Sequence, residues 1–195
     1  MSPVLAAAAI AGSFLLGSIP FGVLVAKRRG VDLKKVGSGN IGATNAARAL
    51  GKRAGMVVLL LDTFKAFAPT FAAARWLDGG PELAAAVGFA AFLGHIYSPW
   101  LRFRGGKGVA CALGAFLALA PLATLMAGAV CAVVVVATRI GSLGSLLGMA
   151  ALLPALVLRH EPRAYLTLAG AMFALVIWRH RDNLRRLAKG QENKL

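Results

Sequence analysis

The chain has 195 residues, of which 58% are hydrophobic and only 15% are charged, and its formal net charge is +15. This composition excludes an ordinary soluble domain, in which about a quarter of the residues are charged. It indicates an integral membrane protein. Since no segment is long enough for a separate soluble domain, we expect one all-α polytopic domain over residues 1–195.

Apolar stretches of membrane-spanning length recur along the whole chain. We expect about seven transmembrane helices, and the boundaries around Pro121 are left open. The first stretch lacks a basic leading segment and contains Pro20, which favours a retained span over a secretory signal. The expected spans are 4–26, 54–76, 83–101, 109–120, 122–138, 145–158 and 164–178.

The basic residues are distributed unevenly between the two sides that these spans define. Of the 22 Lys and Arg residues, 18 fall in segments on the side opposite the N-terminus. By the positive-inside rule, the N-terminus is expected outside and the C-terminus in the cytoplasm. Much of the net charge then reflects topology and attraction to anionic lipid, and nucleic acid is not an expected partner.

Residues 37–45 form the first of three polar segments, with the sequence GSGNIGATN. Glycines allow a backbone to turn its N–H groups toward a ligand, and Lys34, Lys35 and Arg48 flank the segment. The spacing also matches G-x-G-x-x-G, but it follows a membrane span and not a β-strand, which argues against a dinucleotide site. We therefore interpret this segment as a phosphate-binding loop, the alternative being a flexible cytoplasmic turn.

The second polar segment is RFRGGKG at 102–108. It resembles a Walker A loop only superficially, because Leu101 stands at the position of the first glycine and Gly108 at that of the Ser or Thr. Glycines 105, 106 and 108 are expected to free backbone amides around the Lys107 ammonium for a phosphate, with a helix starting at Val109. The alternative is that these basic residues only fix the orientation of the chain in the membrane.

The third polar segment is RHRDNLRR at 179–186, followed by Gly190 and Glu192. Basic residues directly after a last span are common, so this segment taken alone has an equally good topological explanation. Under the expected topology all three segments lie on the cytoplasmic face. We expect them to converge on one site.

Several polar residues fall within or at the start of the apolar spans. His95 is more typical of an interhelical hydrogen-bond partner than of a catalytic base. Asp62 and Lys65 are three residues apart, so we expect a structural pair that helps to orient the loop after residues 37–45. Ser142 and Ser145 start the sixth expected span, where helix N–H groups favour an anion, or else they are simple N-caps.

Together these segments resemble the acyl-phosphate-dependent glycerol-3-phosphate acyltransferases of bacteria, the PlsY family. The resemblance rests on GSGNIGATN at 37–45, on Gly94-His95 through Pro99 to FRGGKGVA at 103–110, and on HRDNLRRL at 180–187 with Gly190 and Glu192. Asp62, Lys65 and the Ser142–Ser145 stretch fit the same family. Arg104 departs mildly from it, standing where lysine is usual.

The resemblance implies transfer of a fatty acyl group from acyl phosphate to the 1-hydroxyl of sn-glycerol 3-phosphate, giving lysophosphatidic acid and phosphate. Implied contacts of glycerol 3-phosphate are Arg48, Lys107, His180 and Asn183. Implied contacts of the acyl phosphate are Ser38, Gly39, Asn40, Thr44, Gly105, Gly106, Lys107, Ser142 and Ser145. Lys107, Ser38 and His180 would be catalytic, and supporting residues would be Asn45, Asp62, Lys65, His95 and Glu192.

The same resemblance implies a bacterial inner-membrane enzyme with its active site facing the cytoplasm. We expect no cofactor, no metal and no need for acyl carrier protein at the transfer step. Because an acyl phosphate is already activated and no Ser-His-Asp set is evident, we expect direct transfer without an acyl-enzyme. The proton acceptor is left open between a substrate phosphate and His180.

Two other classes of protein are alternatives to the acyltransferase. A transporter or channel for an organic phosphate would use the basic segments as a vestibule, but the chain shows no internal repeat. A structural scaffold gives no reason for three segments this polar. The acyl-CoA-type signature His-x-x-x-x-Asp is also absent from the sequence after all three histidines.

Overall fold

A computed structural model describes residues 1–194 of the chain, and the described part contains helices and no strand. A short 3₁₀ helix (Pro99–Leu101) follows the fifth α-helix. The α-helices are α1 (Pro3–Ser18), α2 (Phe21–Lys27), α3 (Ala43–Leu50), α4 (Lys52–Trp76), α5 (Gly80–Ile96), α6 (Val109–Leu119), α7 (Pro121–Thr138), α8 (Gly141–Leu158), α9 (Arg163–Arg179) and α10 (Arg181–Ala188).

Prolines account for two of the helix boundaries. The first expected span is broken at Ile19 and Pro20, since proline lacks the N–H that would continue the α1 ladder. The expected split near Pro121 is confirmed. There α6 ends at Leu119 and Pro121 opens α7, a position where its missing N–H costs nothing.

Five helical stretches in the described residues are long and apolar enough to cross a membrane, by length and composition. They are Pro3–Lys27, Lys52–Trp76, Gly80–Leu101, Pro121–Thr138 and Gly141–Leu158. The helix α6 has 11 residues and rises only about 16 Å, roughly half of a bilayer core. The expected number of about seven spans therefore stays a prediction.

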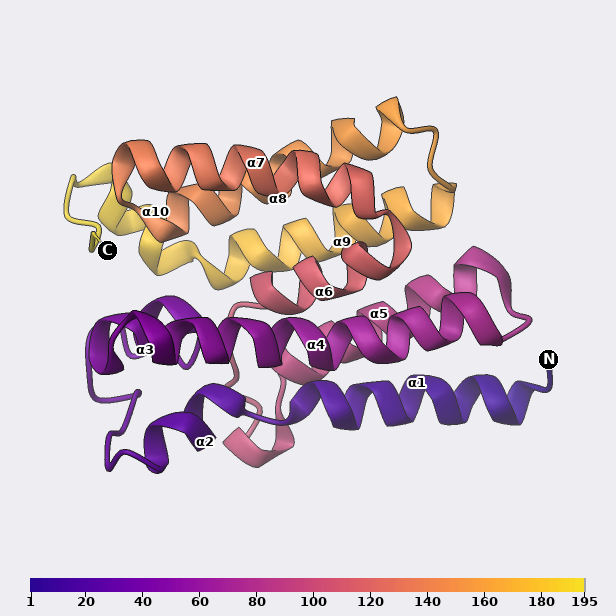
Figure 1. The fold of residues 1–195 in the computed structure, drawn as a ribbon, viewed down its shortest axis with the longest axis horizontal. Coiled ribbons are helices and arrows are strands. Elements are labelled where there is room, and N and C mark those ends of the chain that lie inside the picture. The colour runs from indigo at the N-terminus through magenta and orange to yellow at the C-terminus, as the bar shows by residue number, and fades with distance from the viewer. Residues whose placement is uncertain (195) are drawn as a thin grey trace.

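Glycines allow the helices to approach one another closely. A Cβ on Gly17 would lie within 3.0 Å of the Ala91 backbone, which joins α1 to α5. A Cβ on Gly114 of α6 would lie equally close to the Thr63 carbonyl of α4. The short helix α6 lies between the group of α1, α4 and α5 and the group of α7, α8 and α9 (Figure 1).

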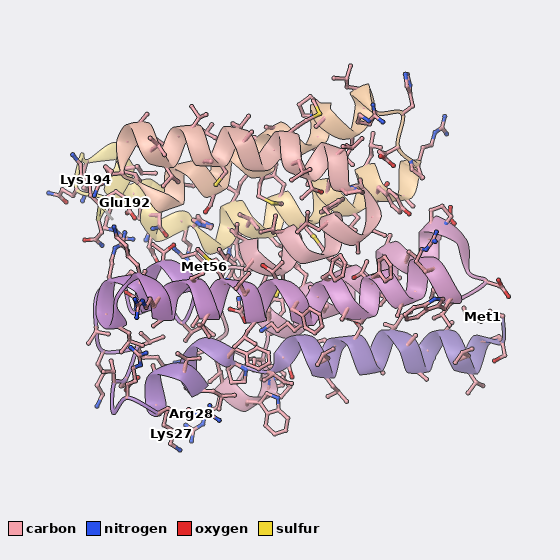
Figure 2. All side chains as sticks on the ribbon, viewed as in Figure 1. Met1, Lys27, Arg28, Met56, Glu192 and Lys194 are labelled. Carbon is pink, nitrogen blue, oxygen red and sulfur yellow. The ribbon has the colours of Figure 1, made fainter. Side chains whose placement is uncertain are left out.

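The three polar segments lie toward the same end of the helix bundle, with residues 102–108 set further in than the other two, and the N-terminus lies at the opposite end (Figure 1). Figure 2 shows Lys27, Arg28, Glu192 and Lys194 at the polar end, far from Met1. The orientation of these ends relative to the membrane stays a prediction. The first and third polar segments are partly helical, because Ala43 starts α3 and Arg181 starts α10.

Candidate active site

The three polar segments meet around one cavity of about 140 Å³, which we call the inner cavity. Its walls come from the segment before α3, from the starts of α3, α6 and α8, from α4 and α5, and from α10 and the residues on either side of it. The expected convergence is therefore confirmed. Predicted site residues that line the inner cavity are Ser38, Asn40, Thr44, Asn45, Arg48, Asp62, His95, Lys107, Ser142, Ser145, His180, Asn183 and Glu192.

Four predicted residues do not line the inner cavity. Gly39 and Gly105 line a neighbouring cleft, whereas Gly106 and Lys65 line neither hollow. Lys65 is only 1% exposed and lies behind the wall formed by Asp62 and His95. These four residues can therefore act on the inner cavity only through other groups.

Asn45 holds together the segment that precedes α3. Its Nδ2 group donates toward the carbonyls of Leu33, Val36 and Asn40 at 2.8–3.0 Å, and its Oδ1 accepts from the Ser38 N–H at 2.9 Å. Since Asn45 is 1% exposed, these bonds lie out of water. A side chain at one position in the first turn of α3 thus determines the path of the polar loop.

Three helices point their N-terminal ends into the inner cavity. Their first residues line it, and within residues 1–194 no side chain caps any of the three ends. An uncapped end leaves backbone N–H groups without partners and carries roughly half a positive charge. The lining residues from these ends are Ala43 and Thr44 of α3, Val109 and Ala110 of α6, and Gly141 and Ser142 of α8. Anion-binding N–H groups therefore come from three directions.

The segment before Lys107 works differently from our expectation. The N–H groups of Gly105 and Gly106 donate to the carbonyls of Ile96 at 2.9 Å and His95 at 3.1 Å. They are not free for a phosphate, so the prediction of free amides at these two glycines is wrong. The Arg179 guanidinium donates to the carbonyls of both glycines, at 2.7 and 3.1 Å. Hydrogen bonds on both sides hold this segment rigidly in front of Lys107.

Lys107 is the central cation of the inner cavity. Its Nζ donates to Asn183 Oδ1 at 2.5 Å. Burial, aided by Arg186, Arg48 and Arg179, lowers the pKa of Lys107 to about 8, against the opposing effect of Glu192. Near neutral pH most Lys107 side chains therefore remain charged.

Glu192 ties the C-terminal residues to the site. Its carboxylate accepts from Asn183 Nδ2 at 2.6 Å, Ser142 Oγ at 3.1 Å and Arg186 Nε at 2.8 Å. Burial would raise the pKa of Glu192, but the hydrogen bonds from these partners outweigh it and lower the pKa.

Arg48 is held by the backbone just beyond Glu192. Its guanidinium donates to the carbonyls of Asn193 at 2.8 Å and Lys194 at 3.3 Å. The segment 192–194 consequently lies along one side of the inner cavity.

His180 is a buried neutral base in this arrangement. Its Nδ1 lies 2.8 Å from the Val176 carbonyl, so Nδ1 carries the proton and Nε2 is an acceptor. Burial and the nearby Lys107 charge lower the pKa of His180 to about 4. The ring is therefore neutral at physiological pH and can accept a proton or a hydroxyl hydrogen bond.

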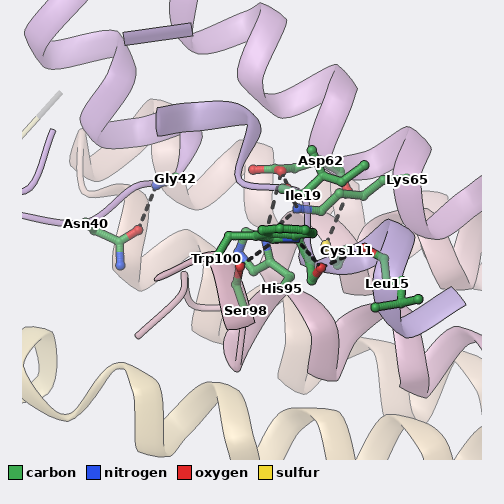
Figure 3. A network of polar contacts seen from close by, with 11 residues as sticks. Leu15, Ile19, Asn40, Gly42, Asp62, Lys65, His95, Ser98, Trp100 and Cys111 are labelled. Atoms are coloured by element: carbon green, nitrogen blue, oxygen red, sulfur yellow. Dashed lines mark hydrogen bonds and ion pairs between the residues drawn. The ribbon is translucent and has the colours of Figure 1, made fainter. Parts of the chain in front are cut away.

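A polar network within the bundle supports the cavity from behind (Figure 3). Lys65 Nζ lies 2.8 Å from Asp62 Oδ1, donates to the Ile19 carbonyl at 2.7 Å, and lies 3.0 Å from His95 Nδ1. The predicted interhelical role of His95 is confirmed, because this contact joins α4 to α5. The predicted pairing of Asp62 with Lys65 is confirmed, but its predicted role is wrong: Lys65 binds the Ile19 carbonyl at the break between α1 and α2, not the loop after residues 37–45.

Two arginines of the site were not among the residues expected from the sequence. Arg179 fixes the carbonyls of Gly105 and Gly106, and Arg186 pairs with Glu192 at 2.8 Å. Both follow the last apolar stretch, where basic residues normally reflect topology alone. Only the spacing Arg186-x₅-Glu192 hinted at a pair.

Comparison with known proteins gives consistent matches along almost the whole chain. The family described as "Glycerol-3-phosphate acyltransferase" matches residues 7–190. A glycerol-3-phosphate acyltransferase of Anaeromyxobacter sp. (strain Fw109-5) is 48% identical over 198 residues, covering 98% of this chain and 97% of the relative. One of Myxococcus xanthus (strain DK1622) is 48% identical over 182 residues, covering 93% of this chain and 95% of the relative.

Two solved structures share the fold. The crystal structure of PlsY, an integral membrane glycerol 3-phosphate acyltransferase, in its glycerol 3-phosphate form has a TM-score of 0.94 and 39% identity, covering 98% of this chain and 96% of that one. Its lysophosphatidic acid form has a TM-score of 0.91 and 38% identity, with 98% and 95% covered. Together with the apolar helices, these likenesses indicate a multi-pass membrane protein.

Proposed function

Because the chain belongs to the glycerol-3-phosphate acyltransferase family, we propose that it uses an acyl phosphate as donor and acylates the 1-hydroxyl of sn-glycerol 3-phosphate. The products are lysophosphatidic acid and inorganic phosphate. The observation that carries this proposal is one cavity that combines Lys107, Arg48 and three uncapped helix N-termini. Such a site suits two phosphates held side by side, one as a handle and one as a leaving group.

The step requires no covalent enzyme intermediate. The 1-hydroxyl oxygen forms a bond to the acyl carbonyl carbon, and the bond from that carbon to the phosphate oxygen breaks. The phosphate leaves with the bonding electron pair, while the hydroxyl proton passes to a base. No cofactor, metal or acyl carrier protein is needed to balance this reaction, and positioning with electrostatic stabilisation supplies the rate enhancement.

Lys107 is proposed as the main electrostatic catalyst. It lines the inner cavity together with Arg48, His180 and Asn183, the proposed contacts of glycerol 3-phosphate. Its charge would stabilise the negative charge that grows on the leaving phosphate. Arg48 would hold the phosphate handle, for which it exchanges its bonds to the carbonyls of residues 193 and 194.

We assign the acyl phosphate to the side formed by Ser38, Asn40, Thr44, Ser142 and Ser145, all of which line the inner cavity. Their hydroxyl and amide groups lie in the same cavity as the uncapped N-terminal ends of α3 and α8. Gly39, Gly105 and Gly106 act here by shaping the backbone around Ser38 and Lys107.

The base that takes the hydroxyl proton is a substrate phosphate or His180 Nε2. His180 is suited to the task because Nδ1 is bonded to the Val176 carbonyl and the ring is neutral. We further propose that the site faces the cytoplasm from a bacterial inner membrane. There the water-soluble substrate and the basic end of the bundle would share one compartment.

A turnover assay with purified protein tests the donor. The protein is incubated with glycerol 3-phosphate and palmitoyl phosphate, and phosphate release and lysophosphatidate are measured. Parallel reactions contain palmitoyl-CoA or palmitoyl acyl carrier protein. Product from palmitoyl phosphate alone supports the proposal. Product only from a thioester contradicts the donor assignment, and uptake into vesicles without product indicates a transporter.

A pair of variants tests the site. Lys107→Ala should remove nearly all turnover without lowering the melting temperature. Lys35→Ala is the control and should stay active, because Lys35 is an exposed cation at the same end of the bundle. Mass spectrometry of quenched protein tests direct transfer. An acyl group on Ser38 would exclude it.

A further inference from the structure

A second hollow, which we call the outer cleft, adjoins the inner cavity. It has a volume of about 370 Å³ and lies between the first polar segment, the segment before Lys107 and the corner of α9 and α10. Its walls carry one carboxylate, from Asp182. Its cations are Lys34, Arg104, Lys107, Arg179, Arg181 and Arg186.

The two hollows share a wall. Ser38, Asn40, Lys107 and Asn183 line both of them. Since the Lys107 ammonium donates to the Asn183 side chain at 2.5 Å, this hydrogen bond spans the boundary between them. Movement of either side chain would join the outer cleft to the inner cavity.

The solvent-facing cations of the outer cleft are free to bind an anion. Within the described residues, neither Lys34 nor Arg104 has an ion-pair partner. Arg181 is held in place, because its guanidinium lies 5.1 Å from the centre of the Trp178 ring and donates to the Trp178 carbonyl at 3.3 Å. A fixed, unneutralised guanidinium recognises phosphate well.

We propose that the outer cleft is a second phosphate-binding site, an antechamber that receives glycerol 3-phosphate from water before it enters the inner cavity. This inference rests on the proposed function. An acyl phosphate carries a lipid tail and arrives through the membrane, whereas glycerol 3-phosphate is a water-soluble dianion. Since the outer cleft is lined by exposed cations and shares a wall with the inner cavity, it offers the dianion a separate aqueous approach. Its positive field raises the encounter rate.

Steady-state kinetics test the route of entry. In the double variant Arg104→Ala/Arg181→Ala, kcat/KM for glycerol 3-phosphate should fall about tenfold at low salt, with kcat and the kinetics of acyl phosphate unchanged. The difference from the unmodified protein should shrink as ionic strength rises. Arg104→Lys/Arg181→Lys should restore most of the loss. Equal losses for both substrates, or full activity in the double alanine variant, would overturn the antechamber.

Arg28→Ala provides the matched control. Arg28 is an exposed cation at the same end of the bundle, and it lines neither hollow. Its removal should leave kcat/KM for glycerol 3-phosphate within about twofold of the original value. A tenfold loss of kcat/KM in Arg28→Ala would show that the overall positive charge of this end of the bundle attracts glycerol 3-phosphate, and not the outer cleft.

A binding measurement separates this inference from the proposed function. Inorganic phosphate is titrated into protein in phosphatidylcholine nanodiscs, with Arg48→Ala weakening the inner cavity. A weak site should persist in Arg48→Ala and disappear when Arg104→Ala and Arg181→Ala are added. If the protein binds phosphate in the outer cleft but has no acyltransferase activity, the proposed function is refuted and the phosphate site in the outer cleft stands. Absence of phosphate binding in Arg48→Ala would overturn the antechamber. Displacement of the bound phosphate by phosphatidylglycerol would also overturn it, and would assign the outer cleft to a lipid headgroup.

Discussion

Lys65 and His95 meet inside the helix bundle, with Lys65 Nζ 3.0 Å from His95 Nδ1. Because a lysine ammonium can only donate, Nδ1 of the imidazole is the acceptor and Nε2 carries its proton. On that Nε2 side the ring lies against Gly106, where any added Cβ would come within 3.0 Å of Nε2. A buried cation thus fixes a ring, and the ring supports the backbone next to Lys107.

Gly106→Ala should reduce turnover about 100-fold, because its Cβ collides with a ring that cannot move and shifts Lys107 by a fraction of an ångström or more. Turnover and the melting temperature are both measured. Gly128→Ala is the matched control, since a Cβ there meets nothing within 4 Å. Undiminished turnover in Gly106→Ala would contradict the supporting role of His95.

Lys65→Met should lower the free energy of unfolding by about 3–5 kcal/mol, because it leaves the buried Asp62 carboxylate without its counter-ion. The double variant Asp62→Asn/Lys65→Met removes both charges and should recover much of this loss. Thermal melting in detergent gives the order of the three proteins. If the double variant melts no higher than Lys65→Met, the ion pair is not the source of the effect.

The rate should fall as pH rises through about 8, because the Lys107 ammonium loses its proton there. Below that pH the lysine is charged and this contribution to catalysis is complete. Lys107→Arg keeps a positive charge at all these pH values, so its residual activity should lack the alkaline fall. The measurement is kcat/KM for glycerol 3-phosphate from pH 6 to about 10. The same alkaline fall in both proteins would assign it to another group.

Glu192→Ala should loosen the C-terminal residues and reduce turnover, because Asn183, Ser142 and Arg186 all lose one common acceptor. Amide hydrogen exchange over 188–194 should accelerate in this variant. Asp182→Ala is the control. The Asp182 carboxylate is 62% exposed and lies 3.4 Å from Arg185, so its removal should lower the free energy of unfolding by less than about 1 kcal/mol. Unchanged exchange in Glu192→Ala would show that the C-terminal segment is held by other contacts.

Labelling with a membrane-impermeant thiol reagent tests the orientation in whole cells. Single cysteines are introduced as Ser2→Cys and Lys189→Cys in a background with Cys111→Ala and Cys131→Ala, the two native cysteines. Ser2→Cys should react in intact cells, and Lys189→Cys only after the cells are opened. The reverse pattern would place the active site outside.

Several features of the molecule were predictable because they depend on short stretches of sequence. Apolar stretches of membrane length predict the long helices, and Pro20 and Pro121 mark breaks that the backbone chemistry of proline requires. Polar, glycine-rich stretches of the chain cannot lie in lipid, so they gather at the ends of the helices. On this basis the three polar segments that meet at the inner cavity could be named in advance, whereas its individual contact residues were implied by the family resemblance.

Only the tertiary structure decides how those residues are connected. Whether the amides of Gly105 and Gly106 are free depends on the carbonyls of His95 and Ile96, which approach closely because both glycines lack side chains. One partner of Lys65 is the Ile19 carbonyl, exposed by a helix break 46 residues away. Hydrophobicity determines which segments enter the membrane, but it acts without direction. Hydrogen bonds and helix ends have direction, so their partners are settled only when α3, α6 and α8 pack around one cavity.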